Sequence, residues 1–191
     1  MRACLFVGSA ALALAFGPSP ISTAEEDAKA PNLLVNGSFE DGPEPAEFIS
    51  LDEKNTDIKG WTVIKGQIDY IGTYWIAAHG KRSLDLHGSP GLGGVKQEFA
   101  TKKGSKYKVS LAIAVNPDGG AARKLTVEAA GKSETFKADP KDPSRTDMKW
   151  ETKTWEFTAT DDKTTLEIYT AETDNASCGP ALDDVSVVEV K

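Results

Sequence analysis

The sequence has few of the residues that hold metal clusters or disulfide frameworks together. Its 191 residues include two cysteines and two histidines, which argues against a zinc finger, a haem site and a cysteine-rich secreted scaffold. Positive charge is also scarce, because 22 basic residues face 29 acidic ones and the net charge at pH 7 is −7. A chain of this sign has no broad electrostatic attraction for nucleic acid or anionic lipid. We therefore expect no nucleic-acid partner.

Long apolar runs are also lacking, except at the N-terminus. One basic residue precedes an apolar stretch over residues 3–17, prolines end that stretch, and small residues at 22–24 precede two acids. This order is typical of a secretory signal peptide, and the stretch is shorter than the roughly 20 residues that span a membrane. We predict a signal peptide over residues 1–24, a polar linker over 25–31, and no membrane insertion. The mature protein would be secreted: extracellular, periplasmic or associated with a cell wall.

Cleavage would leave a single cysteine. Cys4 lies in the signal peptide, so Cys178 would be alone and no intrachain disulfide could form. Stability would then depend on the core, on a metal ion or on both. Because nothing in the sequence indicates a base beside Cys178, we interpret it as a small buried residue and not as a catalytic thiol.

Alternating apolar and polar residues recur through the rest of the chain. In YKVSLAIAV, over residues 107–115, every odd position is apolar, and the same period returns over 125–129, 154–158 and 166–168. A period of two indicates strands with one face on a core. Turn signals rich in Asn, Asp, Gly and Pro separate these segments, and no helical period persists. We predict one all-β sandwich domain over residues 32–191.

Carboxylates flank the first and last of these segments, LLVNGSFEDG and PALDDVSVV. The terminal strands of a sandwich commonly lie side by side, and calcium takes six to eight oxygen ligands. Glu40 and either Asp183 or Asp184 could therefore bind one ion. Alternation with Val185 and Val187 puts Asp183 on their inward face, where a carboxylate needs a partner. The alternative, that these are solvated acids at strand ends, stays open.

Several motifs occur in a fixed order along the chain. LLVNGSFEDG is followed by IDYIGTYW, GKRSLDLHG, GLGGVKQEF, VSLAIAVNP and CGPALDDVSVV. Together they resemble the family of domain of unknown function 642, which overlaps the bacterial choice-of-anchor C group and includes plant cell-wall proteins. The resemblance implies a galactose-binding-like jelly roll of two antiparallel sheets, associated with polysaccharide. Plant members look like two such domains with paired cysteines, whereas this chain has one domain.

The resemblance also implies a metal site. Related carbohydrate-binding modules that begin with N-G-x-F-E and end with D-D-V often hold a structural calcium ion between these motifs. On the matching positions, Ca²⁺ would be bound by Glu40 and Asp183, with further oxygens from near Ser38 and Ser83.

Aromatic and polar residues near two loops are candidates for sugar binding. Tyrosine and tryptophan rings stack on the apolar face of a pyranose, while polar side chains bind its hydroxyl groups. Loops commonly present such groups. For each aromatic residue, packing into the core is the alternative. The candidate ligand-binding residues are Asp69, Tyr70, Tyr74, Trp75, Asn116 and Asp118.

These observations predict a secreted, non-catalytic carbohydrate-binding module with a polysaccharide or glycan as its partner. Two alternatives stay open. One is a structural or adhesive extracellular protein that binds another protein. The other is a small polysaccharide-active enzyme, which would need a pair of carboxylates. The spacing singles out no such pair, and no Ser-His-Asp or Cys-His arrangement is evident, so we expect no catalysis.

Overall fold

A computed structural model of the chain describes residues 31–89, 91–173 and 177–190, and this part is built from strands and the loops between them. It confirms the all-β prediction. The predicted signal peptide and nearly all of the predicted linker lie outside the described residues. Within these three ranges no helix is long and apolar enough to cross a membrane.

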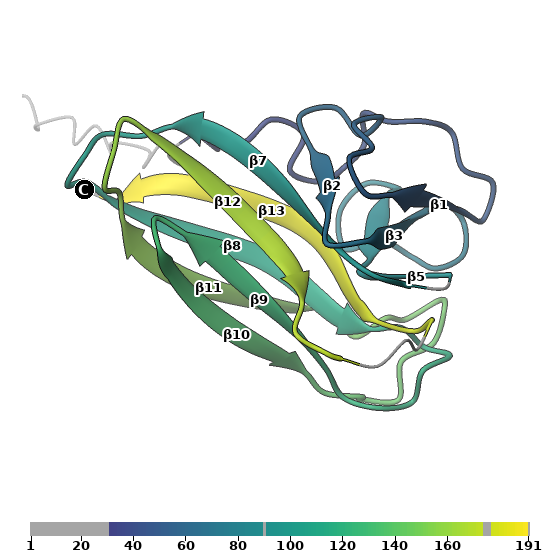
Figure 1. Cartoon of the computed structure of the whole chain (residues 1–191). Coiled ribbons are helices and arrows are strands. Elements are labelled where there is room, and N and C mark those ends of the chain that lie inside the picture. The colour runs from purple at the N-terminus through teal and green to yellow at the C-terminus, as the bar shows by residue number, and fades with distance from the viewer. Residues whose placement is uncertain (1–30, 90, 174–176, 191) are drawn as a thin grey trace, which may run out of the picture.

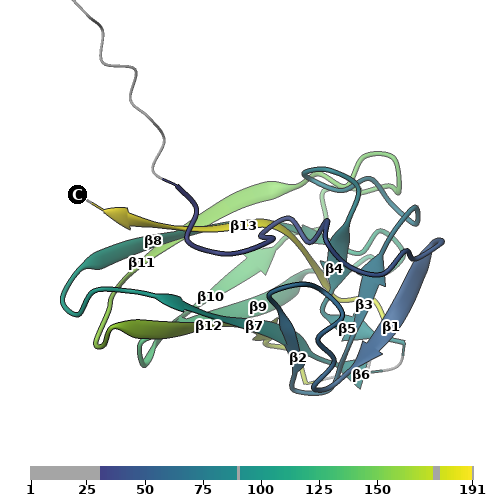
Figure 2. The same ribbon diagram turned by 90° about the horizontal axis from the view of Figure 1, so that it is seen from above.

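Two antiparallel sheets pack face to face (Figures 1 and 2). The six-stranded sheet has the order β1 (Phe48–Asp52), β3 (Gln67–Ile71), β4 (Ser83–Asp85), β13 (Pro180–Val190), β8 (Lys106–Val115) and β11 (Glu151–Thr158). The five-stranded sheet has the order β10 (Lys132–Ala138), β9 (Arg123–Ala129), β12 (Lys163–Thr170), β7 (Gly94–Ala100) and β2 (Thr62–Ile64). A short pair, β5 (His87–Gly88) and β6 (Gly91–Leu92), lies apart from both.

The core lies between the two sheets and follows the predicted alternation. The odd residues of β8 are buried against apolar residues of β9 and β12, so each strand gives one face to the core. The predicted strand segments are therefore confirmed in β8, β9, β11 and β12. Fully buried members of this core include Leu111, Ile113, Leu125, Val127, Leu166 and Ile168.

The two ends of the domain lie side by side, as predicted, but the first segment is not a strand. It runs along β13, where the Leu33 amide donates to the Val187 carbonyl at 2.9 Å and the Val185 amide donates to the Gly37 carbonyl at 2.8 Å. Residues 33–38 form bends and turns, and Asn36 takes a φ of +54°. The Asn36 side chain bonds neighbouring backbone groups, which favours a turn over a strand.

Asp183 lies on the face of β13 opposite to the predicted one. The register of β13 against β8 shifts between Asp183 and Ser186, and Asp184 takes a φ of +46°. Such a bulge inserts one extra residue and resets the alternation. Leu182 and Val185 therefore both belong to the core, and Asp183 points to the outer face of the sheet. The parity argument was wrong at this point, although Asp183 is fully buried.

Candidate functional site

The outer faces of the two sheets differ in character. The outer face of the five-stranded sheet carries charged and hydroxyl side chains, among them Lys96, Glu98, Glu128 and Thr165. The outer face of the six-stranded sheet carries a second apolar cluster, formed by Ile71, Trp75, Ala114, Met148 and Ala181. The β3–β4 loop (residues 72–82) and the β10–β11 loop (139–150) supply part of this cluster and lie at one end of the sandwich (Figure 1). The site is built on this face.

A cavity of about 170 Å³ opens on this face. Its lining includes Phe48, Asp69, Tyr74, Asp85, Asn116 and Cys178. Asp69 on β3 and Asp85 on β4 are partners in the antiparallel register. Directly opposite residues point to the same face, with Cβ atoms about 5 Å apart. The strand pairing therefore brings two carboxyl groups into one cavity.

Hydrogen bonds fix both carboxyl groups. The Ser50 hydroxyl donates to Asp69 Oδ1 at 2.6 Å and the Ser89 hydroxyl donates to Oδ2 at 2.7 Å. Asp85 accepts from Asn116 Nδ2 at 2.7 Å and from two backbone amides. Asp69 is 4% exposed and Asp85 is 1% exposed. The cavity thus holds acceptors and donors in fixed positions.

The protonation of Asp85 is set mainly by its burial. Burial raises the pKa of Asp85 to about 7, and the nearby charge of Asp69 acts in the same direction. The hydrogen bonds from Asn116 and the backbone act against this shift in pKa. Asp85 therefore changes its protonation near neutral pH.

Tyr74 stands at the edge of this cavity and is held from several sides. Its ring contacts Phe48 edge-on at 5.4 Å between ring centroids, and its hydroxyl donates to Asp118. The guanidinium of Arg145 lies 3.8 Å from the ring centroid and donates to the Tyr74 hydroxyl and to Asp118. The hydrogen bond with Asp118 raises the pKa of Tyr74 to about 12, and the bonds from Tyr74 and Arg145 lower the pKa of Asp118.

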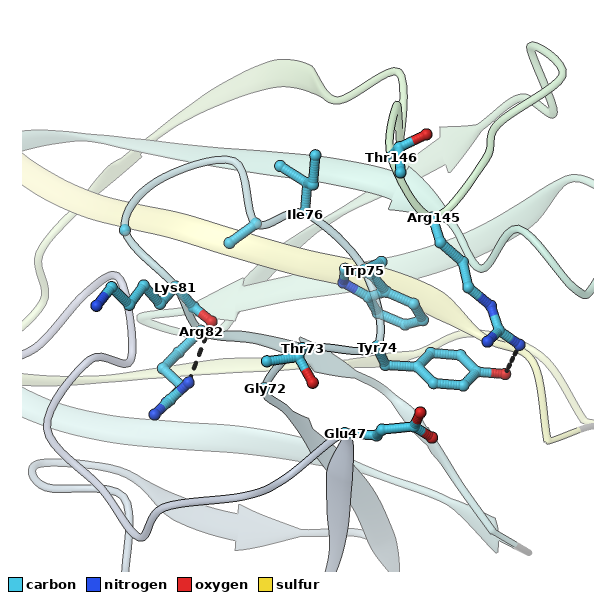
Figure 3. A pocket seen from close by; sticks show the side chains of 12 residues that line it. Glu47, Gly72, Thr73, Tyr74, Trp75, Ile76, Lys81, Arg82, Arg145 and Thr146 are labelled. Atoms are coloured by element: carbon cyan, nitrogen blue, oxygen red, sulfur yellow. Dashed lines mark hydrogen bonds between the residues drawn. The ribbon is translucent and has the colours of Figure 1, made fainter.

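A larger, open pocket of about 540 Å³ shares Tyr74 and Trp75 with the cavity. Figure 3 shows its side chains, with Arg145 near the Tyr74 hydroxyl and Lys81 and Arg82 beyond Thr73. The two loops that frame the pocket are tied together, because the Ile76 amide donates to the Arg145 carbonyl at 2.9 Å. The shared residues make the cavity and the pocket one continuous surface region.

Comparison with known proteins identifies the family. The model described as "Protein of unknown function (DUF642)" matches residues 32–188. The chain belongs to this family. The predicted resemblance is therefore confirmed over almost the whole domain.

One curated relative and two solved structures give further comparisons for this DUF642 chain. Halomucin of Haloquadratum walsbyi is 31% identical over 169 residues, which is 85% of this chain but 2% of that protein. The carbohydrate-binding module TmCBM61, solved with β-1,4-galactotriose, has a TM-score of 0.52 and 15% identity, over 84% of this chain and 100% of that one. An arabinose-bound α-L-arabinofuranosidase has a TM-score of 0.51 and 17% identity, over 83% of this chain and 26% of that one. These likenesses confirm the galactose-binding-like jelly roll.

The structure brings together five of the six predicted ligand-binding residues of this DUF642 chain. Asp69, Tyr74, Trp75 and Asn116 line the cavity, and Asp118 is bonded to Tyr74.

Tyr70 lies elsewhere, and Trp75 has a different role from the predicted one. Tyr70 is fully buried between the sheets, and its hydroxyl donates to the Phe39 carbonyl. The alternation within β3 explains this, because Asp69 and Tyr70 must point to opposite faces. Trp75 is 4% exposed and its indole nitrogen donates to the Ser83 hydroxyl. Its ring therefore supports the loop and offers no free face for stacking.

Sequence reasoning missed several residues of the site. Asp85 alternates with Leu84, so its outward direction was readable, but its pairing with Asp69 depends on strand register. Arg145 comes from a distant loop that carried no signal of its own. Cys178 was interpreted as a buried residue, and it lines the cavity; burial raises the pKa of its thiol, which keeps it neutral. A neutral thiol is a poor nucleophile.

Two of the four predicted calcium ligands, Glu40 and Asp183, are bonded to backbone amides of the β3–β4 loop. Glu40 Oε1 accepts from the amides of Lys81 and Arg82 at 2.8 and 2.9 Å. Asp183 Oδ2 accepts from the amide of His79 at 2.8 Å. The other two, at Ser83 and Ser38, lie at the end of this loop and in the turn before Glu40.

These residues fit calcium in the type of donor. Burial raises the pKa of Asp183 to about 7, although the hydrogen bonds from the backbone amides of His79 and Asp184 act against this shift. Among the described residues, no cationic side chain pairs with this carboxylate. Carboxylate and backbone carbonyl oxygens are among the ligands that calcium prefers. In the part of the chain that the structure describes, however, no group of three or more Asp, Glu, His or Cys side chains could hold a metal ion. Further oxygens would have to come from backbone carbonyls and water, and the calcium site stays a prediction.

Proposed function

We propose that this chain is a secreted, non-catalytic carbohydrate-binding module that holds a polysaccharide or glycan on the outer face of the six-stranded sheet. The observation that carries the proposal is the cavity at Asp69, Asp85 and Asn116. It combines fixed hydrogen-bonding groups with the aromatic side chains of Phe48 and Tyr74. In a mainly apolar pocket, a small number of precisely placed polar groups orients the ligand. A sugar unit has hydroxyls that can bind such polar groups and apolar faces that can contact the aromatic rings.

The dimensions of the cavity favour a single sugar unit. Its volume of about 170 Å³ is below the roughly 300–1,000 Å³ of pockets that take drug-sized ligands. The polar side chains are already ordered by Ser50, Ser89 and backbone amides, so binding would order few of them further. The polysaccharide would therefore insert one unit, with its neighbours lying over Tyr74 and the open pocket.

The comparisons support this proposal at the level of the fold. The module TmCBM61 was solved with a galactotriose, so a β-1,4-linked galactan is a reasonable first ligand to test. The predicted signal peptide supports secretion. The chain spans about 2% of the length of its curated relative halomucin, and nothing of that protein's activity is carried over.

The test is binding of the mature chain to a panel of neutral and acidic polysaccharides, measured by calorimetry. Asp69→Asn and Asn116→Ala should each lower the affinity about tenfold, because each removes a hydrogen bond or leaves a buried group unpaired. Glu98→Gln, on the outer face of the other sheet, is the control and should bind as the wild type does. Wild-type affinity in both site variants would show that the glycan binds elsewhere. Absence of binding to every polysaccharide would contradict the proposal itself.

One observation favours catalysis as a second candidate function. Asp69 and Asp85 are opposite partners in one cavity, and the pKa of Asp85 is raised to about 7. Glycosidases use two carboxyl groups whose pKa values differ. Release of reducing ends from the same polysaccharides, lost in Asp69→Asn, would establish an enzyme. The many hydrogen bonds to both carboxyl groups favour binding over turnover.

We also propose a structural calcium ion between the first segment and β13. Glu40 and Asp183 would supply its carboxylates, and groups near Ser38 and Ser83 would supply further oxygens. The support is that Glu40 and Asp183 both bind backbone amides of the β3–β4 loop, and that Asp183 is buried with no cationic side chain as a partner among the described residues. The ion would provide the positive charge that this carboxylate otherwise lacks.

A further inference from the structure

The lining of the open pocket beside Tyr74 has more basic than acidic side chains, although Glu44 and Asp118 pair with two of the basic ones from outside it. The lining contains three basic side chains, those of Lys81, Arg82 and Arg145, and one acid, Glu47. The whole chain has a net charge of −7. A local excess of one sign in a concave surface attracts ligands of the other sign. The lining therefore favours an anionic group.

Arg145 is positioned by its neighbours while part of its guanidinium stays available. Its Nη2 donates to the Tyr74 hydroxyl at 2.6 Å and to Asp118 at 2.8 Å, and the group lies over the Tyr74 ring. A guanidinium has five N–H donors. Within the described ranges, Nε and Nη1 of Arg145 have no acceptor, and the side chain is 48% exposed. A guanidinium held in this way is suited to a planar carboxylate or to a sulfate.

Lys81 and Arg82 differ in what they can offer a ligand. Glu40 holds the backbone of both residues, so the loop that carries them is fixed. The Arg82 side chain is 11% exposed and forms an ion pair with Glu44, so it adds charge but little contact. Lys81 is exposed, and its amine has no ion pair with any residue of the described part. Figure 3 shows Arg145 and Lys81 on opposite sides of Tyr74 and Thr73.

We propose that this pocket binds anionic groups of the glycan, either uronic acid carboxylates or sulfate esters, with Arg145 and Lys81 as the contacts. The inference rests on the proposed function, because it concerns the sugar units of the glycan that are adjacent to the unit bound in the cavity. The charge of Asp69, which also acts on Asp85, would repel an anion inside the cavity. The anionic groups therefore lie on the Arg145 side of Tyr74.

The experiment compares the mature protein on three polymers: polygalacturonate, a sulfated galactan and neutral β-1,4-galactan. Wild type should bind at least one anionic polymer about tenfold more tightly than the neutral one, and about 0.5 M NaCl should remove most of this advantage. Arg145→Gln and Lys81→Gln should each lower the ratio of anionic to neutral affinity, by about tenfold for Arg145→Gln. Lys103→Gln, in the turn between β7 and β8, makes the same change in charge and should leave the ratio unchanged.

The two anionic polymers separate the two sources of negative charge. Arg145→Lys keeps the charge but loses the paired N–H groups, so it should weaken binding to the preferred anion more than Lys103→Gln does. Thermal denaturation checks that each variant folds. If Arg145→Gln does not fold, Lys81→Gln provides the test of the affinity ratio. Equal wild-type affinity for neutral and anionic polymers would overturn this inference and leave the proposed function intact. Failure to bind any of the three would overturn both.

Discussion

Asp69 and Asp85 face each other across β3 and β4, and both are almost completely buried. Like charges directly opposite each other in a sheet are destabilising, and burial adds a desolvation cost. Hydrogen bonds from Ser50, Ser89 and Asn116 offset part of this cost. A sheet that only had to fold would be more stable with apolar residues at these positions. Stability alone therefore does not explain the arrangement, whereas the proposed glycan site would.

The Asp85 carboxyl should make stability depend on pH. Its pKa is about 7 in the folded state and 3.8 for an unperturbed aspartate, so the folded state holds more protons between these two pH values. The free energy of unfolding should then fall as pH rises from about 4 to about 7. Urea denaturation at several pH values measures this slope, and Asp85→Asn should make it shallower. Part of the slope should remain in this variant, because the pKa of Asp183 is also about 7. If Asp85→Asn keeps the full wild-type slope, the pH dependence does not come from Asp85.

Tyr74 and Trp75 should separate into a binding residue and a structural one. Tyr74→Phe removes the hydroxyl that bonds Asp118 and Arg145, and we expect weaker glycan binding with a change in stability of about 1 kcal/mol or less. Trp75→Ala removes a buried ring and should lower the free energy of unfolding by about 3 kcal/mol. Calorimetric titration and urea denaturation of both variants measure the two effects. An exchange of the two outcomes would refute these roles.

The strands could be predicted from local patterns, because the alternation of apolar and polar residues within a strand is visible in a short stretch of sequence. β8 follows from a run of odd apolar positions, and its inward face is buried as expected. The alternation failed at Asp183, because a bulge depends on how β13 pairs with β8 and leaves no mark in the period itself. The first segment was misjudged as strand-like because Asn36 bonds the backbone and favours turns.

The candidate site was predictable only in part, for the same reason. Asp69 and Tyr74 are close in sequence and could be grouped, but Arg145 lies 71 residues from Tyr74 and reaches it only through the packing of two loops. The pairing of Asp69 with Asp85 requires the register of β3 and β4. Tertiary contacts between distant segments, and not local patterns, create the cavity.

Calcium should raise the melting temperature of the mature protein. A ligand that binds the native state alone stabilises it in proportion to the logarithm of its concentration, so a chelator should lower the midpoint and added calcium should restore it. Asp183→Asn should abolish this response, whereas Asp161→Asn, in the exposed turn between β11 and β12, should retain it. Differential scanning calorimetry provides the midpoints. If neither chelator nor calcium changes the melting temperature of the wild type, the prediction of a calcium ion at this site is wrong.

Gly37 should be essential for docking the first segment on β13. A Cβ atom at this position would lie 2.0 Å from the Val185 carbonyl oxygen, which is the oxygen that also accepts from Asn32 Nδ2 at 3.1 Å. Gly37→Ala must therefore push the segment away from β13 and break these contacts, and we expect a loss of about 2 kcal/mol or more in the free energy of unfolding.

Gly104 offers a matched control for this prediction. Its φ is +85°, and a Cβ atom there would meet nothing within 4 Å. Gly104→Ala should therefore show only the backbone cost of about 1–2 kcal/mol for a left-handed residue. Gly37 lies three residues before the proposed calcium ligand Glu40, so displacing this segment should also displace Glu40. Gly37→Ala should therefore weaken any response to calcium, while Gly104→Ala should not. Equal losses of stability in the two variants, with an unchanged calcium response in both, would show that the first segment is not held through this contact.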